Sequence, residues 1–224
     1  MKSFVLGLLT VSMFLNMSVL HAQAPKGMGK SDPEAKKVLD AVSAKFKTFK
    51  SVKANFTLKI ENGGGKVQGT KTGSVLMKGV KYKVLITGQE IYCDGATIWT
   101  YDVAAKEVQI SALDNSSGSI TPQKLFTNFY DKDFLFILNP DVKRAGKTYQ
   151  VVELTPIDKT KPFFKVLLEV DKATKIIMST QVFEKTGNRY LYAINTISTS
   201  TVIPDDTFAF NVKKFPGVEV IDLR

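Results

Sequence analysis

The stretch from Ser51 to Ile60 reads SVKANFTLKI and decides the fold. Its apolar side chains stand at every second position, with polar ones between them: Val52, Ala54, Phe56, Leu58 and Ile60. A strict period of two predicts a β-strand with one apolar face and one polar, solvent-exposed face. The run Asn62-Gly63-Gly64-Gly65 that follows predicts a turn.

Segments with the same strand character recur along the rest of the chain. They cover residues 67–78, 82–87, 90–93, 97–101, 107–112, 149–155, 163–170, 176–183 and 189–197, with short closing strands expected at 208–212 and 217–221. Asp94-Gly95 supplies hairpin turn chemistry, whereas the state of residues 134–138 stays open. Because strand twist accumulates, we expect a curled antiparallel sheet of about 10–11 strands that forms an incomplete, half-open barrel.

Two segments interrupt the strand pattern and predict helices. Ser31 and Glu34 have the spacing of a capping box, and Pro33 is tolerated in a first helical turn. An apolar stripe follows and predicts a helix that ends near its last member: Val38, Leu39, Val42, Phe46 and Phe49. Thr121-Pro122 predicts a second helix. Both need an apolar surface to pack on, and we expect them to cover the concave side of the sheet.

The first residues have the features of a targeting segment. Lys2 precedes a charge-free, mostly apolar run from Phe4 to Leu20, and Ala22-Gln23-Ala24 follows. We expect a signal peptide over residues 1–22, with cleavage after Ala22 or Ala24. An uncleaved anchor is the alternative, but the run is shorter than the roughly 20 apolar residues that a spanning helix needs. Residues 23–30 then form a flexible leader, and residues 31–224 form a single domain.

Composition excludes several kinds of chemistry. Cys93 is the only cysteine, and His21, the only histidine, leaves with the signal peptide. Ser-His and Cys-His nucleophiles and His/Cys zinc sites are therefore excluded, whereas carboxylate chemistry is not. The net charge of +10 is spread along the chain. It favours acidic partners or anionic lipid head groups, and export argues against nucleic acid.

Several segments in order resemble one known family, the outer-membrane lipoprotein carrier proteins of LolA type. SVKANFTLKI (51–60), TGSVLMKGVKYKV (72–84) and CDGATIWTYD (93–102) are similar to the family's N-terminal strands and its Asp-Gly-x-x-Leu-Trp-x-Tyr segment. TPQKLF (121–126) stands where the family has a mid-chain lid helix. TFAFNVKKFPGVEVID (207–222) is similar to its closing signature. The resemblance covers nearly the whole mature chain.

The resemblance implies a fold and a function. The family's fold is an incomplete barrel lidded by helices, and its cavity receives lipoprotein acyl chains. For this chain, the resemblance implies a monomeric periplasmic carrier without cofactor or metal, and not an enzyme. Its partners would be acylated lipoproteins, an inner-membrane lipoprotein-releasing ABC transporter, and an outer-membrane acceptor or the outer membrane itself. Two alternatives stay open: a lipid or envelope-stress sensing module on the same fold, and a carboxylate-dependent envelope glycan hydrolase.

Alternation along the strands, together with the resemblance, gives the expected site. The cavity is expected to be lined by Val52, Phe56, Leu58, Leu76, Tyr82, Val84, Trp99, Val166, Leu168 and Val170. The helical lid is expected to present Val38, Val42, Phe46, Leu125, Phe126 and Phe129. Family members often carry an Arg that holds the lid shut, and Lys78 stands in the corresponding turn here. Lys78 is the candidate substitute, although it lacks the planar fork of Arg.

Overall fold

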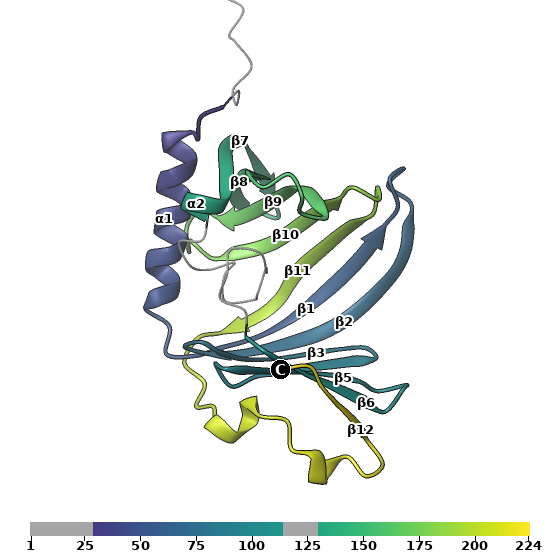
Figure 1. The fold of residues 1–224 in the computed structure, drawn as a ribbon. Coiled ribbons are helices and arrows are strands. Elements are labelled where there is room, and N and C mark those ends of the chain that lie inside the picture. The colour runs from purple at the N-terminus through teal and green to yellow at the C-terminus, as the bar shows by residue number, and fades with distance from the viewer. Residues whose placement is uncertain (1–28, 114–129) are drawn as a thin grey trace, which may run out of the picture.

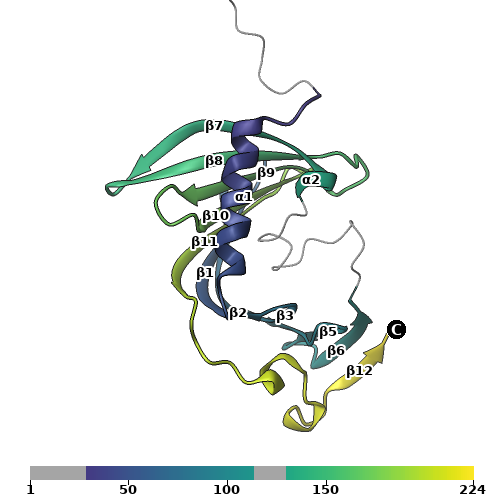
Figure 2. The same ribbon diagram turned by 90° about the vertical axis from the view of Figure 1, so that its left-hand side faces the viewer.

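The protein is described here by a computed structural model, which describes residues 29–113 and 130–224. One long, strongly bent sheet makes up most of it, and a single long helix, α1 (Pro33–Lys47), crosses its inner side (Figures 1 and 2). The predicted fold class, a mainly β half-open barrel, is confirmed.

Helix α1 begins at a side-chain cap. Asp32 is the N-cap and accepts a hydrogen bond from the backbone N–H of Glu34 at 2.9 Å, so the cap is not the expected Ser31. Pro33 occupies the first turn, where its missing N–H costs nothing. Lys45 and Lys47 lie in the last turn, where cations suit the helix dipole. The predicted apolar stripe faces the sheet.

Within residues 29–113 and 130–224, twelve strands build the sheet. In chain order they are β1 (Val52–Glu61), β2 (Val67–Lys78), β3 (Lys81–Ile86), β4 (Gln89–Cys93), β5 (Thr97–Asp102), β6 (Glu107–Ala112), β7 (Phe134–Arg144), β8 (Lys147–Pro156), β9 (Phe163–Asp171), β10 (Ile177–Glu184), β11 (Arg189–Ser198) and β12 (Glu219–Asp222). A single helical turn, α2 (Tyr130–Asp133), leads into β7. Residues 134–138, which the sequence left open, are therefore strand.

The spatial order of the strands is β12-β6-β5-β4-β3-β2-β1-β11-β10-β9-β8-β7. Chain neighbours within β1–β6 and within β7–β11 pair as antiparallel hairpins, and β1 pairs with β11 to join the two halves. Strands β12 and β7 form the edges, so the sheet stays open. Only β12 runs parallel to its neighbour, β6. Figure 2 shows the resulting bend, with β7–β9 facing β3–β6 across the hollow side.

The segment after β11 lies on the outer, convex side of β3–β6 (Figure 1). It contains two short 3-10 helices, η2 (Asp205–Phe208) and η3 (Val212–Lys214). The strand expected at residues 208–212 is therefore wrong. Its N–H groups bond locally instead, as from Ala209 to the carbonyl of Asp206. Phe208 is fully buried and fixes the segment to the sheet, which an edge strand would not do.

Candidate functional site

The concave face of the sheet carries two apolar clusters, and α1 spans both. The β7–β10 cluster includes Val38, Leu39 and Val42 of α1, packed against Leu154 and Leu168. The β1–β4 cluster is built on Val52, Ala54, Met77, Tyr82 and Cys93, and Phe46 and Phe49 pack on it. A cavity of only about 10 Å³ lies between the C-terminal half of α1 and the sheet, so Val42 and Phe46 pack closely there.

The floor of the hollow is one continuous row of cross-strand neighbours. Leu58 pairs with Tyr192, Tyr192 with Thr180, and Thr180 with Leu168. Leu168 in turn faces Val152 of β8. Because direct neighbours in a sheet share a face, this row runs from one half of the barrel to the other. Apart from the Thr180 hydroxyl and the Tyr192 phenol, it is hydrocarbon.

Most of the residues expected to line a cavity lie on this face. The register places there Val52, Phe56, Leu58, Tyr82, Val84, Val166, Leu168 and Val170. The structure adds others that the sequence analysis did not name, among them Val75, Ile91, Ile98, Ile177 and Ile194. The signal for these was the same period-two alternation, which is harder to see in short strands.

Leu76 and Trp99 require a correction, because both lie on the opposite face. Leu76 pairs with Lys53 and Lys83, whereas its neighbour Met77 pairs with Val52 and Tyr82. Trp99 packs on a convex aromatic cluster made of Tyr92, Tyr101, Val108 and Phe210. For Trp99 the physical reason is that the C-terminal segment also buries the outer face there.

The expected lid residues divide into two groups. Val38, Val42 and Phe46 lie on α1 and pack on the concave face, as expected for a lid. Leu125, Phe126 and Phe129, together with the helix expected from Thr121, lie outside the described residues. Of the expected lid residues, the structure therefore describes only those on α1.

Polar contacts fix the N-terminal half of α1 to the β7 edge. The backbone N–H of Asp32 donates to the carbonyl of Phe136 at 2.8 Å. The Tyr130 hydroxyl donates to Asp40 at 2.9 Å, and Lys36 forms ion pairs with Asp40 and Asp131, both at 3.1 Å. Burial raises the pKa of Asp40, but the hydrogen bonds from Tyr130 and Lys36 outweigh it and lower the pKa overall. Exposed contacts of this kind contribute little each.

The concave floor holds no charge near the centre of the β1–β4 cluster. Tyr82 and Cys93 are direct cross-strand neighbours and both are buried. Desolvation by burial raises the pKa of the Tyr82 phenol and of the Cys93 thiol, so both groups stay neutral at physiological pH. Within residues 29–113 and 130–224, no group of three or more His, Cys, Asp or Glu could hold a metal ion.

Lys78 does not contact α1. Its ammonium group donates to Asp205 at 2.8 Å and to the carbonyl of Ile203 at 3.2 Å. Lys81 donates to the other Asp205 oxygen at 2.9 Å. The expectation that Lys78 holds a lid shut is corrected for the part of the lid that the structure describes: on the convex side, this lysine fastens the C-terminal segment to the β2–β3 hairpin.

This fastening predicts a pH dependence. The hydrogen bonds and charges of Lys78 and Lys81 lower the pKa of Asp205 to about 2. A lowered carboxyl pKa means that the stabilisation is present above the unfolded-state pKa of about 3.9 and is lost as pH falls towards 2. Asp205→Asn should therefore be less stable than the parent at pH 7 and should match it near pH 2, as measured by urea unfolding.

The matched control is Asp206→Asn, because Asp206 is the next residue and forms no ion pair with any residue that the structure describes. Its stability difference from the parent should not change between pH 4 and pH 2. An Asp205→Asn difference that persisted undiminished at pH 2 would contradict the assigned ion pairs.

No helix among the described residues is long and apolar enough to cross a membrane. A family model described as outer membrane lipoprotein carrier protein LolA matches residues 47–211. No curated protein matches the chain.

One solved structure shares the fold, and two others are more distantly similar. An uncharacterized conserved protein from Thermus thermophilus superposes with a TM-score of 0.56 at 10% identity, covering 84% of this chain and 99% of that one. For lipoprotein LppX of Mycobacterium tuberculosis the TM-score is 0.49 at 11% identity, and the match covers 78% of this chain and 100% of that one. For a LolA superfamily protein from Nitrosomonas europaea the TM-score is 0.43 at 18% identity, and the match covers 79% of this chain and 97% of that one.

Proposed function

Because the chain belongs to the LolA family of outer membrane lipoprotein carrier proteins, we propose that it binds lipoprotein acyl chains on its concave face and carries them across the periplasm. An inner-membrane lipoprotein-releasing ABC transporter would load it. An outer-membrane acceptor, or the outer membrane itself, would unload it. The signal peptide expected over residues 1–22 would place it in the periplasm. The protein acts as a carrier, not as an enzyme.

One observation supports this proposal above the others: the hydrocarbon row that joins Leu58, through Tyr192 and Thr180, to Leu168. A protein that needed this row only as core would bury it, yet Tyr192 in its middle is 37% exposed. Helix α1 packs on the β7–β10 cluster and on one side of the β1–β4 cluster, through apolar contacts and a few polar ones at its first half. Displacing such a helix exposes an apolar surface without breaking a hydrogen bond of the sheet.

The magnitudes favour a shallow site over full enclosure. Each methylene removed from water gains about 0.8 kcal/mol, so three chains of about sixteen carbons would gain roughly 35–40 kcal/mol. Non-covalent affinities saturate near about 18–21 kcal/mol. A carrier that must also release its cargo should therefore bury only part of each chain. A face that α1 occupies when empty meets that requirement, because the helix competes with the cargo.

Val84→Glu tests the proposal. Val84 is partly buried on β3 and belongs to the β1–β4 cluster. A carboxylate there should abolish lipoprotein capture, because an ionised group in a hydrocarbon site is strongly unfavourable. The measurement is mass spectrometry of the lipoproteins that copurify with the mature protein from its own periplasm. The parent should retain triacylated lipoproteins, and the variant should lose at least about nine-tenths of them.

Leu85→Glu is the matched control. Leu85 is the next residue on the same strand, is also partly buried, and faces the other way. The Leu85→Glu variant should capture lipoproteins like the parent, while its loss of thermal stability should be similar to that of Val84→Glu. If both variants lost capture equally, or neither did, the concave face would not be the binding site.

A further inference from the structure

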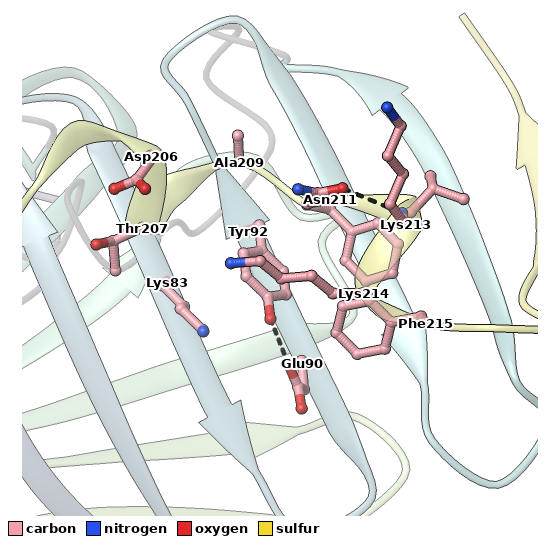
Figure 3. A pocket seen from close by; sticks show the side chains of 12 residues that line it. Lys83, Glu90, Tyr92, Asp206, Thr207, Ala209, Asn211, Lys213, Lys214 and Phe215 are labelled. Carbon is pink, nitrogen blue, oxygen red and sulfur yellow. Dashed lines mark hydrogen bonds between the residues drawn. The ribbon is translucent and has the colours of Figure 1, made fainter.

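The convex side of the sheet carries a second pocket, separate from the concave face. It measures about 880 Å³ and lies between β3–β4 and the C-terminal segment that contains η2 and η3. Figure 3 shows it. Sites for small molecules usually measure about 300–1,000 Å³. The sheet itself stands between this pocket and α1, so acyl chains on the concave face would not enter it.

Two lysines from different parts of the chain reach across the pocket. Lys83 extends from β3 and its ammonium group lies 4.5 Å from the centre of the Tyr92 ring. Lys214, from η3, lines the same pocket, as Figure 3 shows. Neither lysine forms an ion pair with a described residue. Both charges are therefore available to a ligand.

Two acidic residues also line the pocket, and neither forms an ion pair with Lys83 or Lys214. Glu90 accepts a hydrogen bond from the Tyr92 hydroxyl at 2.5 Å. Asp206 stands beside Thr207, at the opposite end of the pocket from Lys213 in Figure 3. With three lysines (Lys83, Lys213 and Lys214) and two carboxylates (Glu90 and Asp206) in its lining, the pocket carries a net charge of +1.

The base of the pocket is aromatic and held in place. Phe210 stacks on Phe215 with ring centres 4.4 Å apart, and meets the Tyr92 ring edge-on at 5.5 Å. The Asp205 ion pairs with Lys78 and Lys81 fix the start of the same segment. A rigid apolar base with cations above it suits a ligand that has an anionic group on an apolar or aromatic body.

We propose that this convex pocket binds a phosphate group, with Lys83 and Lys214 as its cationic contacts and the Tyr92–Phe210–Phe215 surface beneath the attached organic moiety. Phosphate is favoured over a single carboxylate because it carries close to two negative charges at neutral pH and accepts hydrogen bonds on several oxygens. Lysine contacts phosphate as a mobile point charge, which a pocket of this width permits.

The chain offers a built-in reporter. Trp99 is the only tryptophan, is the direct cross-strand neighbour of Tyr92, and packs on the same aromatic cluster. Its fluorescence should change as inorganic phosphate is added at constant ionic strength, with chloride as the balancing anion. A second arm uses phosphatidylcholine vesicles with and without phosphatidic acid. The first arm reports free phosphate, and the second reports a lipid head group.

The test variant is Lys83→Gln with Lys214→Gln, and the matched control is Lys132→Gln with Lys143→Gln, which removes two exposed lysines at α2 and β7. The proposal expects saturable binding in at least one arm, weakened by about tenfold or more in the test variant and within about twofold of the parent in the control. Absence of saturation in both arms, or equal weakening in both variants, would overturn it. Lipoprotein capture should be unaffected, which separates this result from the carrier proposal.

Discussion

Gly73→Ala is expected to destabilise the fold by about 2–4 kcal/mol, because no room exists for a side chain at this position. A methyl group on Gly73 would lie 2.5 Å from the Phe56 ring and 2.6 Å from the backbone oxygen of Leu85. Gly73 faces Phe56 on the adjacent strand β1, so the ring lies over the glycine. The measurement is urea unfolding followed by circular dichroism.

Gly69→Ala provides the control, since Gly69 lies on the same face of the same strand with nothing within 4 Å of the added carbon. It should be neutral or slightly stabilising, by up to about 1 kcal/mol. Phe56→Leu separates the two contacts. Gly73→Ala should remain destabilising in that background, because the Leu85 oxygen belongs to the backbone and cannot rotate away. Full recovery would show that only the ring conflict matters.

Leu39→Ala is expected to cost about 3 kcal/mol and to loosen α1 specifically. Leu39 lies on α1, is 2% exposed and packs into the β7–β10 cluster. If α1 is a covering element, truncating its central contact should free the helix before it unfolds the sheet. Hydrogen exchange should then accelerate in the amides of α1 far more than in those of β1 and β2.

The companion variant is Lys37→Ala on the outer side of α1. Lys37 pairs only with Glu34, and both side chains are largely exposed. Its effect on stability should stay within about 0.5 kcal/mol. Equal acceleration of exchange in α1, β1 and β2 of Leu39→Ala would mean that the helix and the sheet unfold as one unit, so that α1 could not open alone.

The sequence predicted the sheet because alternation and turn chemistry are local. Strand β1 could be placed to within about a residue, since Val52 to Ile60 alternates without exception and Asn62 begins a turn. For a short strand, the sequence predicted less surely which residues lie on the concave face. In β2 the run Ser74-Val75-Leu76-Met77 is apolar on both sides, so alternation could not decide between Leu76 and Met77.

Contacts distant in sequence were out of reach. Trp99 faces outward because Phe210, more than a hundred residues later, covers that side, and nothing near Trp99 predicts this packing. The same holds for Lys78, whose partner Asp205 lies on the segment that follows β11. The strand expected at 208–212 failed for a related reason: Phe208 and Phe210 have strand spacing and are both buried, but Phe208 ends the 3-10 helix η2.

The most direct test of the central claim is photo-crosslinking during lipoprotein loading. A benzophenone side chain would replace Tyr192, which is 37% exposed on the concave row, or Phe164, which is 49% exposed on β9 outside that row. The account predicts that the probe at Tyr192 crosslinks to acyl chains of loaded lipoprotein and that the probe at Phe164 does not. Equal crosslinking at both positions, or crosslinking at Phe164 alone, would contradict it.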